Sequence, residues 1–286
     1  MDMVNEIVDL FHNNFPDIIR SEYTIREILG DITNHFICFK DKDKVVGVSV
    51  IQENVIIFFC VDESYQNQGI GTLLLKQSEA YIKSAGFHKI VVGAGKNYIM
   101  PGIPMSNNAH LFFQKRAYYH SWKDCGCFDM SLLLKDFIWN ENSIGDTIKG
   151  ITYRWATIND IEEIKKCVSD AEEEFLQFYE SKSLYKNDIN SAVLIAEKDQ
   201  EVLGTLIVSR EVEGPGIGSV GCTTTMKEHR NKGIATTMVR LGTKYLKDSG
   251  MTRAFLGYTY SDILSIYNRS GYAVSMEYYM GEKLLI

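Results

Sequence analysis

The 286-residue sequence lacks an excess of basic residues, a long apolar run and a clustered set of metal-binding side chains. Lysine and arginine number 30 against 37 aspartates and glutamates, which gives a net charge of −7. Because binding to nucleic acid depends mainly on cationic contacts to phosphates, this balance argues against a nucleic-acid partner and favours a neutral or cationic small molecule. No apolar run reaches the roughly 18 residues that a membrane-spanning helix requires. We therefore expect no nucleic-acid and no membrane partner.

Signals for secretion, disulfides and metals are equally scarce. The chain opens with Met-Asp-Met-Val-Asn-Glu, an acidic and helical pattern unlike a signal peptide, and a cytoplasmic protein is expected. The six cysteines lie mostly inside apolar strands and are expected to be reduced core thiols. Cys125 and Cys127 are too close to form a zinc site alone, and no His or Cys cluster accompanies them. No metal site is expected.

The length and composition are those of two ordinary globular domains. With 23% charged and 45% hydrophobic residues, 286 residues can form two domains that each bury a core. Residues 140–150 are polar and contain glycine, which is typical of a linker. This interpretation places an N-terminal domain at 1–139 and a C-terminal domain at 151–286.

One short motif occurs twice, at residues 66–71 and again 164 residues later at 230–235. In each copy a β-rich run enters a polar turn, and a helix with apolar spacing leaves it. The same offset aligns Gly86 with Gly250, which end the two helices as C-capping glycines would. Self-similarity of this kind indicates an internal duplication.

A second matching pair of segments lies further along the chain. Residues 113–118 correspond to residues 267–272, but the offset there is 154, so the first copy carries ten extra residues. These fall in the loop 95–108, which holds two of the four prolines. Long loops in compact domains are often functional, and two interpretations stay open: a lid on the substrate side and a surface excursion.

The turn in each motif has the chemistry of an anion site. A glycine-bearing turn that opens a helix directs several backbone N–H groups at one point, with the helix dipole behind them. Glycine also lets a ligand approach the backbone where a Cβ would obstruct it. A single motif of this kind could be only a tight connection, but its repetition favours a phosphate or diphosphate site.

The pattern of apolar runs and turns predicts two α/β domains, each with an antiparallel meander that leads into the motif. The first copy shows no opening strand before its first helix, whereas the second opens with a strand. The predicted strands are 35–40, 45–52, 55–61, 89–94, 151–156, 191–197, 202–211, 220–225, 253–258 and 273–279. The predicted helices are 2–15, 23–29, 69–84, 107–115, 160–178, 234–248 and 262–269.

This order of elements, with Gln/Arg-x-x-Gly-x-Gly/Ala at each turn and the aromatic segments 113–118 and 267–272, resembles the GNAT superfamily of acetyltransferases. The resemblance covers nearly the whole chain as two tandem domains. It implies an α/β fold in which each domain has a mixed, mostly antiparallel sheet flanked by helices. It also implies acetyl-CoA as the cofactor, with its diphosphate on the turn amides and its pantetheine arm along the preceding strand. The cofactor-binding residues implied in this way are Val61, Gln66, Asn67, Gln68, Gly69, Ile70, Gly71, Thr72, Thr225, Arg230, Asn231, Lys232, Gly233, Ile234, Ala235 and Thr236.

The implied reaction is direct attack of an amine on the thioester. It needs a route for the ammonium proton, a donor to the oxyanion and an acid for the departing thiolate. The family commonly supplies that acid from a tyrosine in the last helix, and Tyr267 holds that position; a packed aromatic beside Tyr272 is the alternative. The first copy has Phe113 there, which carries no proton. The N-terminal copy is therefore either a site with inefficient turnover or a structural relic.

No general base is assigned from the sequence. Glu211, Glu213 and Glu53 lie near strand ends, where surface carboxylates are common, and the family often uses water chains for deprotonation. The asparagine that the family often places seven residues before the tyrosine is replaced by Tyr260 in the second copy and by Ser106 in the first.

Two functions from different classes remain after these arguments. The first is an N-acetyltransferase that acts on a primary amine of a small molecule, with catalysis in the C-terminal domain and a monomer or homodimer as the assembly. The second is a non-catalytic protein that binds or senses acyl-CoA. The fold does not identify the acceptor.

Overall fold

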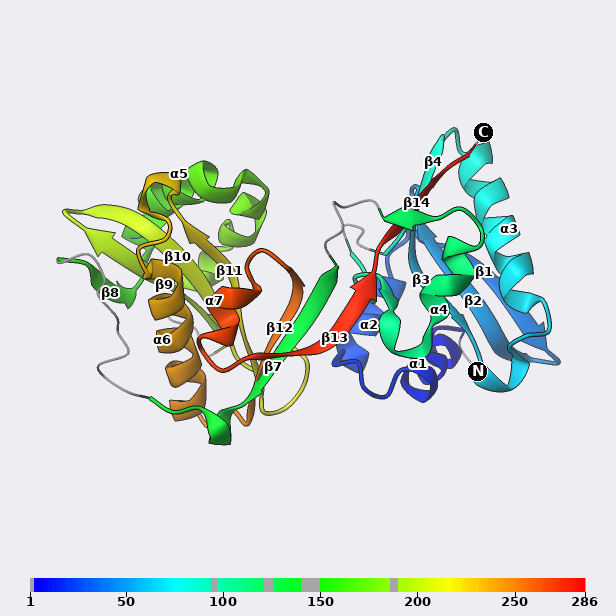
Figure 1. Cartoon of the computed structure of the whole chain (residues 1–286), viewed down its shortest axis with the longest axis horizontal. Helices are drawn as coiled ribbons and strands as arrows, with labels where there is room; N and C mark the ends of the chain where they lie inside the picture. Colours follow the sequence, from blue (N-terminus) through cyan, green and yellow to red (C-terminus); the bar gives the residue numbers. More distant parts are fainter. Residues whose placement is uncertain (1–2, 94–96, 121–125, 140–149, 186–189, 286) are drawn as a thin grey trace. The chain divides into compact units, whose positions relative to one another are not determined.

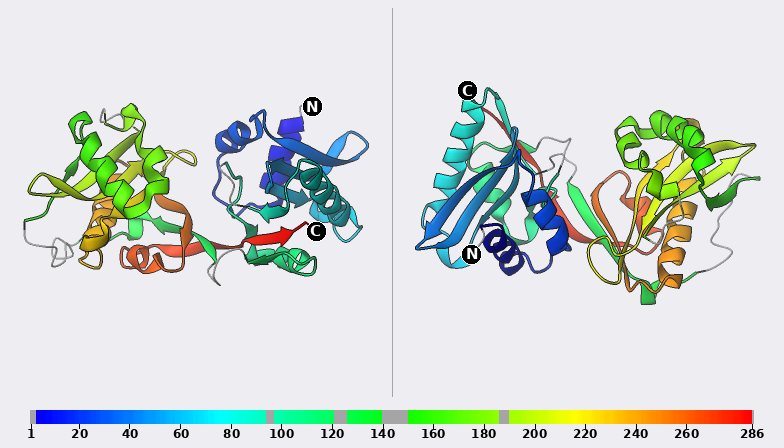
Figure 2. Two further views of the ribbon diagram at one scale, coloured as in Figure 1. Left: turned by 90° about the horizontal axis from the view of Figure 1, so that it is seen from above. Right: turned by 180° about the vertical axis from the view of Figure 1, so that it is seen from behind.

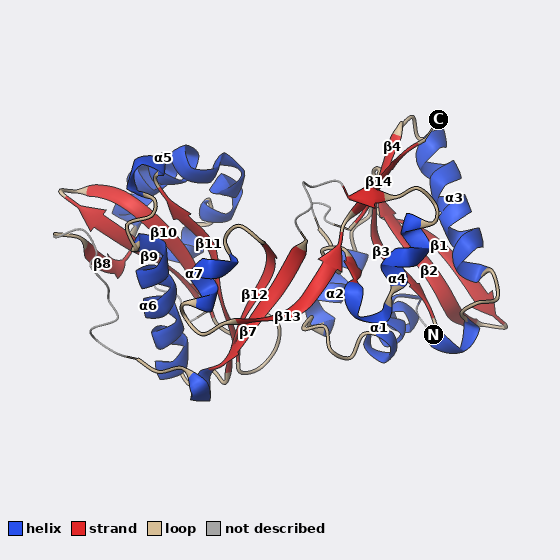
Figure 3. Cartoon of the chain, in the orientation of Figure 1, coloured by secondary structure: helices blue, strands red, loops and turns tan. Residues whose placement is uncertain are grey.

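The computed structural model describes residues 3–93, 97–120, 126–139, 150–185 and 190–285. The chain divides into two compact units: unit 1 comprises residues 1–128 and 276–286, and unit 2 comprises residues 129–275. Each unit is a β-sheet with helices against it (Figures 1 and 3). The predicted fold class, a mixed α/β sheet flanked by helices in each of two tandem units, is confirmed. Almost all of the predicted linker 140–150 lies outside the described residues, as does Cys125.

Unit 1 contains a sheet with the strand order β1-β2-β3-β4-β14-β6, in which β14 is Gly281–Leu284. Its first three strands form the predicted antiparallel meander, and β3 runs parallel to β4. Helices α1 and α3 both pack on β2, and Figure 2 shows α1 and α2 in front of the sheet in the view from behind. The elements, apart from β14, are α1 (Met3–Asn14), α2 (Glu22–Leu29), β1 (His35–Asp41), β2 (Lys44–Gln52), β3 (Val55–Val61), the 3-10 helix Glu63–Tyr65, α3 (Ile70–Ser84), β4 (Lys89–Val92), β5 (Ile103–Pro104), the 3-10 helix Met105–Asn107, α4 (Ala109–Gln114) and β6 (Tyr119–His120).

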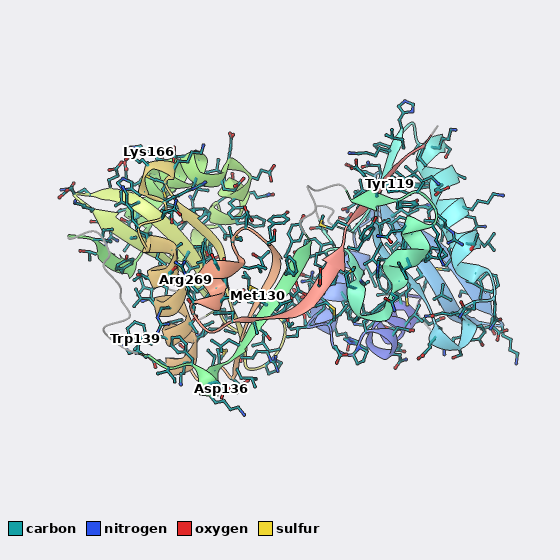
Figure 4. The ribbon with its side chains drawn as sticks, in the orientation of Figure 1. Tyr119, Met130, Asp136, Trp139, Lys166 and Arg269 are labelled. Atoms are coloured by element: carbon teal, nitrogen blue, oxygen red, sulfur yellow. The ribbon has the colours of Figure 1, made fainter. Side chains whose placement is uncertain are left out.

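Unit 2 contains the strand order β7-β12-β11-β10-β9-β8, with β13 next to β7. This unit has two clusters of buried apolar side chains. One includes residues of α6 and α7, and the other includes residues of α5 and of the 3-10 helices after it. Met130 on β7 is fully buried in the first cluster (Figure 4). The elements are β7 (Cys127–Leu133), the 3-10 helix Leu134–Asp136, β8 (Thr152–Trp155), the 3-10 helix Ile158–Asp160, α5 (Ile161–Glu172), the 3-10 helices Glu173–Tyr179 and Lys182–Tyr185, β9 (Ser191–Lys198), β10 (Glu201–Ser209), β11 (Ile217–Thr225), the 3-10 helix Lys227–His229, α6 (Ile234–Asp248), β12 (Arg253–Tyr260), α7 (Leu264–Asn268) and β13 (Ala273–Tyr279).

The limits of the two units differ from the predicted 1–139 and 151–286. Residues 276–286 belong to unit 1, although they were predicted to be part of the C-terminal domain. The last strand, β14 (Gly281–Leu284), was not predicted; it pairs antiparallel with β4 and with β6 in unit 1. Residues 129–139 belong instead to unit 2. The physical reason is that β14 satisfies the backbone groups along one edge of β4, which would otherwise be left unpaired.

Several predicted elements end earlier than expected, among them helix 160–178 and strand 202–211. Helix 160–178 is α-helical only to Glu172 and continues as a 3-10 helix. The predicted strand 202–211 ends at Ser209, because Glu211 has a left-handed backbone (φ +55°) that a strand does not tolerate. Among the described residues, no helix combines the length and the apolarity needed to cross a membrane.

The described part of the predicted loop 95–108 is not a surface excursion. Ile99 has no exposed surface, and the Arg20 guanidinium donates to the carbonyl oxygens of Tyr98 and Ile99, each at 3.0 Å. Gly93 (φ +79°) lies so close to Gly102 that a Cβ on Gly93 would be 2.5 Å from its Cα. The segment is therefore built into the core of unit 1. Its role as a lid stays a prediction.

Candidate functional site

The two motif turns have the same backbone. Asn67 and Asn231 have φ values of +60° and +62°, and the glycines two residues later have +89° and +82°. Gly69 is the N-cap of α3 and Gly233 the N-cap of α6, and neither helix start is capped by a side chain. A Cβ built on either glycine would meet nothing within 4 Å. Glycine is thus required for its positive φ, and the space in front of the helix start is open to a ligand.

The first residue of each motif holds its turn against the preceding strand. Gln66 Nε2 donates to the carbonyl oxygen of Val61 at 3.0 Å, and Arg230 Nε donates to the carbonyl oxygen of Thr225 at 3.3 Å. A second guanidinium nitrogen of Arg230 donates to the Ala171 carbonyl oxygen at 2.8 Å. These side chains therefore position the turn, and an anion bound there would depend on backbone N–H groups.

The other predicted turn residues divide into buried anchors and exposed positions. Ile70 and Ile234 are 6% and 1% exposed and anchor the helix starts in the core. Gln68 Nε2 donates to the Ser64 carbonyl oxygen, whereas Lys232 is an exposed cation 3.5 Å from His229 Nδ1. The exposed and half-buried positions of the helix starts are Gly71, Thr72, Ala235 and Thr236.

Both central strand pairs separate after a short parallel ladder. Strand β3 pairs with β4 at only two positions, Val55 with Val91 and Ile56 with Val92. Strand β11 pairs with β12 only over Ile217 to Ser219. Cys222 in β11 has a positive φ of +47°, and the register between β10 and β11 shifts beside it. Such a bulge breaks the ladder and re-aims the strand. Because both parallel ladders end early, the later part of β3 and of β11 is available to pair with an extended ligand.

Tyr267 on α7 reaches this separated part of β11. Its side chain is 3% exposed, and its hydroxyl lies 3.2 Å from Thr223 Oγ1. Burial raises the pKa of Tyr267 above the ordinary value near 10, while the hydrogen bond with Thr223 acts in the opposite direction. The hydroxyl thus keeps its proton at neutral pH. Arg269, labelled in Figure 4, follows at the end of the same helix.

Unit 1 replaces this pair of hydroxyls by two aromatic rings. Phe113 on α4 corresponds to Tyr267, and Phe59 on β3 corresponds to Thr223 under the offset of 164. Their ring centroids are 5.4 Å apart in an edge-on arrangement. Unit 1 therefore has no proton donor at this position.

The tyrosine that follows has a matching partner in each unit. Tyr272 lies 2.9 Å from Thr243 Oγ1, and Tyr118 donates to Glu79 Oε1 at 3.0 Å. The offset of 164 also relates Glu79 to Thr243. The duplication thus extends to side-chain contacts outside the motif.

Unit 1 contains a pocket of about 810 Å³, and residues of β3 and the end of β4, where these strands separate, line it. Five of the predicted residues of the first copy line it at the turn, and Val61 lines it on β3. Arg116, which was not singled out from the sequence, joins them: it donates to Thr72 Oγ1 at 2.8 Å, and its Cζ lies 3.8 Å from the Phe112 ring centroid. The predicted turn residues in the lining are Gln66, Asn67, Gly69, Gly71 and Thr72.

Each carboxylate considered as a base lies at the opposite end of β3 or β11 from the motif turn. Glu53 is exposed in the turn between β2 and β3 and does not line the pocket. Glu211 is exposed and Glu213 buried in the segment after β10, at the opposite end of β11 from the motif turn. Among the described residues no group of three or more His, Cys, Asp or Glu side chains is arranged to hold a metal ion.

The profile of the Acetyltransferase (GNAT) family matches residues 2–98 and 155–268. The chain belongs to this family, and it carries the family's fold twice. No curated protein sequence matches at a significant level.

Solved structures with the same fold include another tandem GNAT protein. The chain is similar to the GCN5-related glucosamine N-acetyltransferase region of a fungal multi-domain GH3 β-N-acetylglucosaminidase, with a TM-score of 0.81 and 19% identity over 99% of this chain; it spans only 37% of that protein. A tandem GNAT protein from the clavulanic acid biosynthesis pathway gives a TM-score of 0.71 at 12% identity, covering 99% of this chain and 95% of its own. A GCN5-related N-acetyltransferase from Sphaerobacter thermophilus gives 0.75 at 16%, covering 98% and 92%. At these identities the likeness concerns the fold alone.

Proposed function

We propose that the chain is an N-acetyltransferase that moves an acetyl group from acetyl-CoA to a primary amine of a small molecule, and that the reaction takes place in unit 2. The observation that carries this proposal is the buried Tyr267 hydroxyl, held 3.2 Å from Thr223 Oγ1 on the separated part of β11. That strand leads, through the 3-10 helix Lys227–His229 and the motif turn, to the uncapped start of α6. The proposed acid on α7 thus contacts the same strand that precedes the proposed anion site.

The residues of unit 2 fit the cofactor. The Thr225 hydroxyl, at the end of β11, is buried and has no hydrogen-bond partner in the described structure. A buried polar group of this kind is costly unless a ligand satisfies it, and an amide of a pantetheine arm would do so. The open space at Gly233 suits a diphosphate on the N–H groups of the turn. Lys232 adds an exposed cation beside that turn.

When bound, the acetyl thioester supplies an activated acyl group. The protein then binds and orients it: backbone N–H groups at residues 231–236 hold the diphosphate, and the β11 edge aligns the arm. Tyr267 holds a proton on its Oη and can give it to the sulfur as the thiolate departs. The negative charge of the chain favours a cationic acceptor.

A second function, acyl-CoA binding without transfer, is favoured for unit 1 alone. Its turn repeats that of unit 2 and opens into a pocket, but Phe113 offers no proton there. We propose that unit 1 binds the cofactor without catalysing the reaction.

The substitution Tyr267→Phe tests the proposed acid. We expect kcat to fall by about 10²- to 10⁴-fold, as for loss of a general acid, while the Kd for CoA stays the same. Release of CoA from acetyl-CoA would be measured with a panel of primary amines that includes polyamines and glucosamine, the acceptor in the name of the fungal relative. Tyr272→Phe is the matched control, because it removes another buried hydroxyl next to Tyr267 and should leave kcat nearly unchanged. Equal rates for Tyr267→Phe and the wild type would contradict the assignment.

The pH profile gives an independent check. Because the pKa of Tyr267 is raised, its proton-donating form persists as pH rises and is lost only above the ordinary value near 10. The rate should therefore climb as the acceptor amine loses its proton and show no fall below pH 9. A decline that begins near neutral pH would mean that a different group supplies the proton.

A further inference from the structure

The pocket of unit 1 has lining residues of two kinds. The motif turn contributes Gly69 and Thr72, with Arg116 beside them; these form its turn wall. The segment after α1 and the loop 97–104 contribute apolar residues such as Phe15 and Met100, and these form its apolar wall. Residues 56–61 of β3 also line the pocket.

Charged side chains are few in this pocket. Among the described lining residues only Glu63 and Arg116 are ionisable near neutral pH. Glu63 is exposed and begins the 3-10 helix before the turn, and Arg116 donates to Thr72 at the start of α3. A cationic amine against the apolar wall would lose its hydration, and the exposed Glu63 is the one carboxylate in the described lining, which is unfavourable. The apolar wall therefore suits an acyl chain better than an amine acceptor.

Aromatic and aliphatic side chains form the apolar wall. Phe58 is 1% exposed and packs edge-on against Phe15, with centroids 6.2 Å apart. The loop contributes Met100 and Ile103, each 5% exposed. Asn14 in the same wall is occupied structurally, because its side chain donates to the Leu10 carbonyl oxygen and accepts from the Glu63 N–H.

We propose that unit 1 is a binding site for acyl-CoA thioesters with an acyl chain longer than acetyl, the chain lying against Phe15, Phe58, Met100 and Ile103. The inference rests on the proposed cofactor site at residues 66–72. The turn wall holds the diphosphate. Contact with the apolar wall increases the binding affinity for each additional methylene that leaves water. With Phe113 in place of an acid, the thioester is bound and not consumed.

The experiment uses the full chain with the unit 2 site disabled by Gly233→Glu, which places a carboxylate at the anion site. Gly233→Ala carries the same backbone strain without the charge and serves as its control. Calorimetry with CoA, acetyl-CoA, butyryl-CoA and hexanoyl-CoA should give one site, with affinity rising about three- to fourfold for each methylene. Equal affinity for the four ligands would overturn the inference and leave the cofactor site intact. No binding of CoA itself would overturn the unit 1 cofactor site and the inference together.

A second variant locates the acyl chain. Phe15→Asp in the Gly233→Glu background should leave the affinity for CoA unchanged. It should abolish the gain in affinity with acyl-chain length, because it introduces a carboxylate into the apolar wall. Ile32→Asp makes the same charge change at a side chain that is 99% exposed and should keep the full gain. Unchanged CoA binding shows that each variant is folded. If Phe15→Asp kept the full gain, the proposed acyl wall would be refuted.

Discussion

Tyr267 beside Thr223 in unit 2 and Phe113 beside Phe59 in unit 1 occupy the same two positions with different chemistry. Two polar groups satisfy each other in one unit, and two rings pack in the other. Replacing only one residue of a pair by its counterpart from the other unit would leave a hydroxyl against an aromatic ring. The catalytic difference that we propose between the units is therefore also a packing difference.

Introducing a hydroxyl at Phe113 tests this pairing. Phe113→Tyr would bury a hydroxyl against the Phe59 ring, and an unsatisfied buried polar group costs about 1–3 kcal/mol. We expect unit 1 to lose stability by about that amount, measured by hydrogen exchange of the β3 amides, with no gain in transfer rate. Adding Phe59→Thr should recover part of the loss. Unchanged exchange in Phe113→Tyr would show that the site already accommodates a hydroxyl.

The residues of the candidate site were predictable to the extent that they repeat. The glycine turns and the Tyr267 position follow from local patterns, and the turns have the backbone that these patterns require. Thr223 and Phe59 could have been found by carrying the offset of 164 back into the strands. Arg116 could not, because its contact with Thr72 joins residues 44 positions apart and has no counterpart in the second copy, where Ser270 stands.

At the scale of elements, the strands and helices around the motifs follow from local turn signals and periodicity, and most were confirmed. Strand β14 was missed for a physical reason. It has four residues, begins with Gly281, and takes its stability from pairing with β4 about 190 positions earlier. Nothing in its local sequence encodes that partner.

Removing β14 tests its role in unit 1. A chain that ends at Met280 loses the pairings with β4 and β6, and we expect unit 1 to be destabilised by about 2–4 kcal/mol, from about 1 kcal/mol for each main-chain hydrogen bond lost. Hydrogen exchange should speed up in β3 and β4. The amides of β9 and β10 in unit 2 are the internal control and should not change. Equal protection of β4 in both chains would contradict this role.

At the scale of the whole molecule, one strand-turn-helix pattern occurs twice. We propose that both turns bind an anion and that only the second has an acid, Tyr267, near it. The duplication and both turns were evident from the sequence, since the offset relates the residues directly. The assignment of segments to units was not, because residues 129–139 and 276–286 each join the unit opposite to the predicted one. Local sequence determines elements, whereas strand partners across long separations depend on the complete set of edges.

Calorimetric titration of CoA into the wild-type chain and into Gly69→Glu and Gly233→Glu tests the two-site account most directly. Gly69→Ala and Gly233→Ala control for the strain of a side chain at positive φ. The account predicts two molecules of CoA per wild-type chain and one for each glutamate variant, with acetyl transfer lost only in Gly233→Glu. A wild-type chain that binds no CoA, or a stoichiometry that neither glutamate changes, would contradict it.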